Sequence, residues 1–210
     1  MRIIIPFMFV VLLLCGCGDK VERDGSDPSE LITSNTSTTE KDSDNDNVSI
    51  VCEYTSIPTG GFITERITLN IRVLSNNTVE VYCTDFSTEI NGEEVTIDYI
   101  YGETFEITNK QRKELISIIR ENRIASLGDC SSDSYDGSYL YIKLFDKDGE
   151  VIHSCGGLNP MEMEFHETRE AIFELLPDMY TSFRIRSDAE QKVAEYLSEN
   201  YPDEYGYLAN

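Results

Sequence analysis

Few side chains in this chain of 210 residues have the types and spacing that catalysis needs. There are two histidines, His153 and His166, which are too few for most zinc or acid–base sites. The cysteines after residue 20 lie too far apart for the paired spacing of a structural zinc site. The chain also lacks a phosphate-binding glycine loop and a Gly-x-Ser-x-Gly turn. We therefore expect no metal, no cofactor and, on balance, no catalytic activity.

Carboxylates are the remaining catalytic candidates. Asp133 and Asp136, in a polar loop, could serve a hydrolase, because several hydrolytic mechanisms use paired carboxylates. With 39 Asp and Glu residues in the chain, any single pair is weak evidence. Glu162, His166 and Glu170 share one face of an expected helix, a pattern more typical of surface ion pairs than of a metal site. An enzyme remains the alternative interpretation.

Alternating carboxylates also occur before the folded region. Asp42, Asp44 and Asp46 alternate, and Glu53 follows at the twelfth position, as in a calcium-binding loop. Asn47 stands where that loop needs glycine, and no helices flank the segment. We interpret it as a solvated acidic segment.

Four cysteines, Cys52, Cys83, Cys130 and Cys155, are candidates for disulfides. An even count in an exported chain favours bridges, and four cysteines allow three pairings. Sequence order favours Cys52–Cys83 and Cys130–Cys155. However, if one strand separates the first two, they lie about 9–10 Å apart, beyond the usual limit of about 7 Å. The connectivity stays open, and four buried free thiols are the alternative.

The N-terminus has the layout of a secretory signal. Arg2 precedes an almost unbroken apolar run, Ile3–Leu14, which is short of the roughly 20 residues that a permanent membrane span needs. Leu14-Cys15-Gly16-Cys17 resembles the lipobox of bacterial lipoproteins. The resemblance implies cleavage after Gly16 and attachment of lipid, with acyl chains such as palmitate, to Cys17. The alternative is an ordinary signal peptide.

The chain is therefore similar to small surface lipoproteins of unknown function in bacteria. This resemblance implies a protein held on the extracytoplasmic face of the cell membrane through Cys17. Residues 17–47 hold nine acidic residues and too few apolar ones for a core, so we expect a lipid-anchored, disordered acidic linker. The predicted organisation is a signal peptide (1–16), this linker (17–47), a globular domain (48–183) and a C-terminal helix packed on it (184–210).

The formal net charge of −22 excludes nonspecific binding of nucleic acid, which needs clustered Lys and Arg. One expected helix, residues 109–123, departs from this acidity. Its basic residues are Lys110, Arg112, Lys113, Arg120 and Arg123. The helix is either a solvated face beside acidic neighbours or a surface that docks a partner.

Hydrophobic periodicity predicts the elements of the domain. Residues 66–74 and 79–83 form one expected hairpin, and residues 139–145 and 151–154 another. Further expected elements are a β region over 94–107 and three helices, which begin with a capping box at Thr108 and Gln111, with Asn159-Pro160, and with a capping box at Ser187 and Glu190. The predicted fold is α+β, an antiparallel sheet with two or three helices packed on one face, after the signal peptide and disordered linker.

Two classes of function follow from these features. The first is a membrane-anchored extracytoplasmic binding module with a protein or glycan partner, without a catalytic site. The second is the extracytoplasmic hydrolase discussed above, and a minor third is a factor for assembly or stability of the cell envelope. The oligomeric state is not determined by the sequence.

Overall fold

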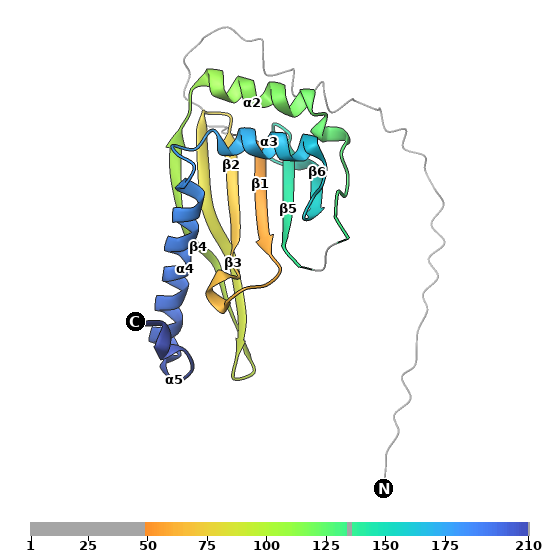
Figure 1. The fold of residues 1–210 in the computed structure, drawn as a ribbon. Helices are drawn as coiled ribbons and strands as arrows, with labels where there is room; N and C mark the ends of the chain where they lie inside the picture. Colours follow the sequence, from red (N-terminus) through yellow and green to blue (C-terminus); the bar gives the residue numbers. More distant parts are fainter. Residues whose placement is uncertain (1–48, 134–135, 210) are drawn as a thin grey trace, which may run out of the picture.

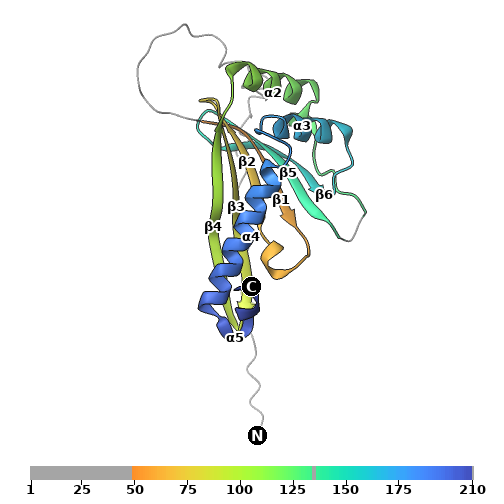
Figure 2. The same cartoon turned by 60° about the vertical axis from the view of Figure 1, so that its left-hand side comes forward.

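Residues 49–133 and 136–209 are described by the structure, a computed structural model, and they contain one antiparallel sheet with helices on one face (Figures 1 and 2). The strands are β1 (Ile50–Pro58), β2 (Thr68–Leu74), β3 (Thr78–Ile90), β4 (Glu93–Glu106), β5 (Ser138–Phe145) and β6 (Val151–Leu158). They lie side by side in the order β4-β3-β2-β1-β5-β6. The predicted fold class is confirmed.

Short turns connect most neighbouring strands. The predicted hairpins are present as β2–β3 and β5–β6. Between β3 and β4, Asn91 and Gly92 both have positive φ angles, 53° and 85°, which suit a two-residue hairpin turn. The only long connection between adjacent strands of the described sheet joins β1 to β5, so these partners are far apart in sequence.

The helices are α2 (Asn109–Glu121), α3 (Met163–Phe173), α4 (Thr181–Asn200) and the short α5 (Pro202–Tyr205). Short 3-10 turns occur at η2 (Ile63–Glu65), η3 (Ile124–Ser126) and η4 (Gly206–Ala209). The predicted capping box of α2 is confirmed. Thr108 Oγ1 accepts a hydrogen bond from the Gln111 backbone N–H at 3.2 Å. Gln111 Oε1 accepts one from the Thr108 backbone N–H at 2.9 Å.

Two predicted helix starts are wrong. Asn159 does not cap a helix. It has a φ of 46°, and its side chain accepts from the Ser138 N–H and donates to the Asp136 carbonyl. Helix α4 begins six residues before Ser187, because its first two turns bury Ser182 and Ile185 in the domain.

The core lies between the sheet and the helices. Helix α4 packs on β3 and β4 through buried residues spaced four apart, namely Ile185, Ala189, Val193 and Leu197. Helix α2 lies across one end of the sheet and packs on α3 (Figure 1). Within the described residues, no helix combines the length and apolar character needed to cross a membrane. The predicted signal peptide and linker fall outside the described residues.

Candidate functional site

The two faces of the sheet differ because side chains alternate along each strand. On β1, Cys52 and Tyr54 point to the helices. The centroids of the Tyr54 ring and the Phe173 ring of α3 are 5.3 Å apart. Glu53 and Thr55 therefore point to the opposite face, over which no described helix lies (Figures 1 and 2). We call this the helix-free face.

A buried carboxylate occupies the middle of the helix-free face. The register places Glu53 of β1 directly between Arg72 of β2 and Lys143 of β5. Glu53 Oε2 accepts hydrogen bonds from Arg72 Nε at 3.0 Å, from Arg72 Nη2 at 2.8 Å and from the Tyr82 hydroxyl at 2.8 Å. Glu53 Oε1 accepts from Lys143 Nζ at 3.1 Å. We call these four residues the Glu53 cluster.

Burial alone would make a charged Glu53 unfavourable, since its side chain is only 6% exposed. This burial acts to raise the pKa of Glu53, but hydrogen bonds from Tyr82, Arg72 and Lys143 outweigh it and hold the pKa below its usual value. Burial and the bond to Glu53 also raise the pKa of Tyr82. The cluster therefore holds a carboxylate and a neutral phenol at neutral pH.

The cations of the cluster remain accessible to solvent. The side chains of Arg72 and Lys143 are 31% and 33% exposed. The Arg72 guanidinium lies 5.1 Å from the centre of the Tyr82 ring and also pairs with Glu80 at 3.7 Å. The cluster therefore holds two positive groups in fixed positions at the surface.

Tyrosines flank the cluster on both sides. On β5, the rings of Tyr139 and Tyr141 are parallel, with centroids 6.4 Å apart, and they share the face of Lys143. On β4, Tyr99 is opposite Thr84 and is 62% exposed. Tyrosine suits contact surfaces because its ring is apolar and its hydroxyl forms hydrogen bonds.

Short polar side chains complete the helix-free face between these aromatic groups. Asn70 accepts a hydrogen bond from the Thr55 hydroxyl at 3.1 Å and donates one to the Thr84 hydroxyl at 3.0 Å. Thr55 and Asn70 are 4% and 6% exposed, so larger neighbours surround them. The face is a network of mutually bonded polar groups that is already ordered without a ligand.

This arrangement suits binding better than catalysis. Both oxygens of Glu53 are already engaged, and its lowered pKa keeps it ionised, so it is poorly placed to transfer a proton. The accessible groups are instead tyrosine rings and cationic donors. These are the side chains that recognition surfaces commonly use.

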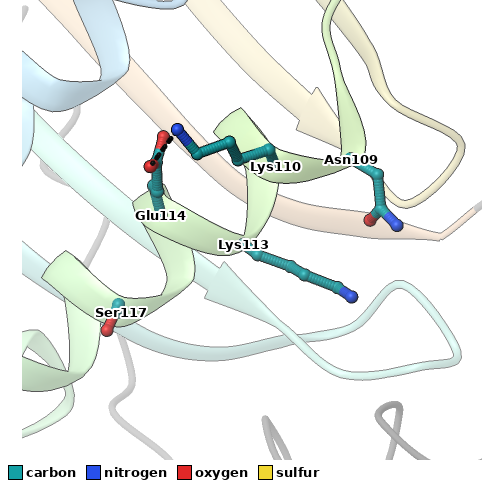
Figure 3. Close-up of a pocket in the computed structure, with 5 residues that line it drawn as sticks. All are labelled: Asn109, Lys110, Lys113, Glu114 and Ser117. Carbon is teal, nitrogen blue, oxygen red and sulfur yellow. Dashed lines mark ion pairs between the residues drawn. The ribbon is translucent and has the colours of Figure 1, made fainter.

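The predicted docking helix, α2, does not form one continuous basic surface. Near its start, Arg112 donates to the Ser75 carbonyl and, at 3.1 Å, to Asn109, so it holds the helix to the β2–β3 turn. Lys110 pairs with Glu114 at 3.4 Å, and Lys113 extends from a different side of the helix (Figure 3). The residues around this part of α2 line a surface pocket: Asn109, Lys110, Lys113, Glu114 and Ser117.

The other two basic residues lie at the far end of α2. Arg120 is in the last turn, and Arg123 follows the helix with a φ of 50°. At 1.5 Å per residue, Lys110 and Arg120 are roughly 15 Å apart along the axis. The five predicted docking residues therefore form two groups, and Arg112 has a structural role.

The four predicted disulfide cysteines are present as buried thiols. Cys52 is opposite Val73 and Cys83 is opposite Leu69, so β2 separates them and they are also offset along the sheet. The strand spacing alone puts them about 9–10 Å apart, which rules out a direct Cys52–Cys83 bridge in this arrangement. Cys130 lies beside the strand of Cys155, since the Cys130 N–H donates to the Gly156 carbonyl at 2.8 Å. Burial, with a smaller contribution from the nearby Cys130, raises the pKa of Cys155 to about 12.

Mass mapping without reduction should therefore distinguish the two pairs. In protein from an oxidising compartment, we expect a Cys130–Cys155 bridge and free thiols at Cys52 and Cys83. Burial raises the pKa of each of the latter to about 12, so they should resist alkylation until the protein unfolds. A Cys52–Cys83 bridge, or four free thiols, would contradict this expectation, and a reduced sample provides the control.

Two further sequence candidates, His166 and Glu53, have structural partners. His166 Nε2 lies 2.8 Å from the Pro160 carbonyl, which holds the start of α3. Glu53, the twelfth position of the calcium-like spacing, is engaged with Arg72 and Lys143. Among the described residues, no group of three or more His, Cys, Asp and Glu side chains could hold a metal ion. Asp133 and Asp136 flank residues outside the described ranges.

The glycine pair Gly156-Gly157 lies within β6. Its φ angles are 128° and 146°, and a side chain at Gly156 would collide with the Leu140 carbonyl. The segment around Cys130 hydrogen-bonds to Gly156, with Cys130 N–H donating to its carbonyl at 2.8 Å. The pair therefore permits close packing of backbone segments.

Sequence reasoning missed the Glu53 cluster. The sequence pattern that could have revealed it is the set of polar residues that alternate with the apolar residues of each strand, for example Glu53, Arg72 and Tyr82. Comparison with known proteins gives no match, either to a family model or to a curated protein.

Proposed function

We propose that this chain is a membrane-anchored extracytoplasmic lipoprotein whose domain binds a glycan without catalysis. The helix-free face is the proposed contact surface. The observation that carries the proposal is the fixed arrangement of Arg72 and Lys143 around a buried Glu53, beside the parallel rings of Tyr139 and Tyr141. A preordered surface loses less conformational entropy when it binds a ligand.

The chemistry of the surface favours a glycan. Sugar rings have apolar C–H faces that pack on tyrosine rings, and hydroxyl edges that accept hydrogen bonds from cationic side chains. Glu53 and Glu80 balance the charges of Arg72 and Lys143, so this part of the face is nearly neutral. That balance suits an uncharged polar ligand. A protein partner is the second outcome that an experiment can reveal.

The lipobox resemblance supports the localisation. Lipid on Cys17 would hold the domain at the extracytoplasmic membrane surface. A flexible chain of about thirty residues has a typical end-to-end distance of roughly 30 Å. This distance would let the helix-free face reach glycans that lie above the bilayer.

The test is retention of the purified full-length protein on immobilised envelope polysaccharides. Replacing both Tyr139 and Tyr141 with alanine should weaken retention about tenfold, equivalent to about 1.4 kcal/mol of binding free energy. Tyr180→Ala is the matched control, since Tyr180 is 65% exposed at the start of α4, away from the helix-free face. Its retention should equal that of the wild type.

Three outcomes can be distinguished. An equal loss of polysaccharide retention in the Tyr139/Tyr141 double variant and in Tyr180→Ala would contradict a role for the helix-free face. Retention of envelope proteins without polysaccharide would assign the face to a protein partner. Retention of neither would remove support for the binding module, provided that thermal unfolding shows the purified protein to be folded.

A further inference from the structure

The first half of α2 is positively charged and has no acidic partner in its first turn. Lys110, Arg112 and Lys113 occur there in a domain whose residues 48–210 include 30 acidic and 13 basic side chains. The N-terminus of a helix also carries partial positive charge from its free N–H groups. Both effects attract a carboxylate to this end of α2.

The described chain enters the domain beside this basic end. The Ser49 backbone N–H donates to Ser75 Oγ at 3.0 Å, and the Ser75 N–H donates to the Ser49 carbonyl at 2.8 Å. The carbonyl of the same Ser75 accepts from Arg112. A single residue therefore connects the start of the described chain to the first turns of α2.

The residues that immediately precede this entry point are acidic. Asp42, Asp44 and Asp46 lie within seven residues of Ser49, outside the described residues. An extended chain covers at most about 3.3–3.6 Å per residue, so these carboxylates can reach roughly 10 to 25 Å from Ser49. The lysines of α2 are within that reach, since Arg112 between them already contacts Ser75.

We propose that the segment Asp42–Asp46 docks on the first half of α2 and pairs with Lys110 and Lys113. These two lysines line the surface pocket shown in Figure 3, on different sides of the helix. The side chains of Lys110 and Glu114 are 84% and 58% exposed, and such an exposed pair exchanges partners at little cost. In the described residues, Lys113 has no ion-pair partner.

Attachment within one chain makes this weak charge pairing effective. A short connection gives the acidic segment an effective concentration in the millimolar range beside α2. The contact would cover the first half of the predicted docking helix. This inference does not use the helix-free face of the proposed function, because α2 lies across one end of the sheet (Figure 1).

Zero-length cross-linking of carboxylates to lysine amines tests the contact directly. The purified full-length protein in a nonionic detergent would be treated with a carbodiimide and mapped by mass spectrometry. We expect links from Asp42–Asp46 to Lys110 or Lys113, and few to Lys192, which is exposed on α4 beside Tyr101 of β4, three strands away from β1. These links should decline as salt rises from 0.1 M to 1 M, because the Debye length falls from about 10 Å to about 3 Å.

A second measurement does not depend on the reacting carboxylates. Acetylation of Lys110 and Lys113 by an amine-specific reagent should be about threefold faster after Asp42, Asp44 and Asp46 are replaced with asparagine, as expected for a partly occupied intramolecular contact. Lys192 should react at an unchanged rate. The matched control replaces Glu22 with glutamine, and Asp24 and Asp27 with asparagine, which removes equal charge from the distant end of the linker.

The contact is overturned by any of three results. The first is that links to Lys192 are as frequent as links to Lys110 and Lys113. The second is a cross-link yield that does not change with salt, and the third is equal acceleration of acetylation in the two charge variants. All substitutions lie outside the described domain, so none removes a described packing contact.

Discussion

Replacing Glu53 with alanine should lower the free energy of unfolding by about 2–3 kcal/mol. Removing one partner from a fully buried ion pair costs about 3–5 kcal/mol, because the remaining charge is left without compensation. The cost here should be smaller, since Arg72 and Lys143 are each about one-third exposed and water can partly solvate them. Urea unfolding at pH 7 measures the difference.

Glu80→Ala is the matched control for this substitution. Glu80 lies on the same face and contacts the same Arg72, but at 3.7 Å and with a side chain that is 36% exposed. We expect a loss of less than about 1 kcal/mol, as for other exposed pairs. If Glu53→Ala were as mild as this control, the Glu53 cluster would not be a stabilising centre.

The Glu53 cluster also predicts a dependence on pH. The pKa of Glu53 is lowered in the folded protein, so the folded state binds fewer protons than the unfolded state at acidic pH. Its stabilising contribution is therefore complete above the usual value of 4.5 and is lost as pH falls through the lower folded-state pKa. Between pH 7 and pH 3, the wild type should lose more stability than Glu53→Gln. An equal loss would contradict the assignment.

Comparison with Glu53→Gln is necessary because another carboxylate titrates in the same direction. Glu103 accepts from both terminal nitrogens of Arg184, at 2.6 and 2.7 Å. These bonds, together with one from Tyr101, lower the pKa of Glu103 to about 2. Its contribution is present in both proteins and cancels in the difference.

The second large effect concerns the predicted anchor. Replacing Cys17 with alanine should abolish membrane retention and remove the acyl chains from the N-terminal peptide. Each buried methylene contributes about 0.8 kcal/mol, so the two or three chains of a lipoprotein hold it firmly, whereas an unacylated domain has no such attachment. Membrane fractionation and mass spectrometry of the mature N-terminus provide the measurements.

Cys15→Ala is the matched control, because Cys15 would leave with the signal peptide. It should be cleaved after position 16 and retained like the wild type. Membrane retention of Cys17→Ala at the wild-type level would refute lipid attachment at this residue. Loss of both proteins from the membrane would instead indicate that the substitutions impair export.

Local sequence patterns determined much of the secondary structure. The alternating apolar residues of 66–74 predict β2, and Thr108 with Gln111 predicts the start of α2, because both depend on residues close together in the chain. The same reasoning failed at Ser187 and Glu190. There the capping pattern lies inside α4, where burial of Ile185 extends the helix toward the N-terminus. Tertiary burial outweighed a favourable local motif.

By itself, the sequence determined the α+β class. It also predicted an exported protein with a lipid anchor, and the single basic helix. Only the tertiary structure decided which side chains meet. Glu53 and Lys143 are 90 residues apart, and they pair because β5 lies next to β1 on the side opposite β2. Strand periodicity reports which face a residue occupies, but strand order and register depend on contacts across the whole domain. The helix-free face is therefore a property of the fold.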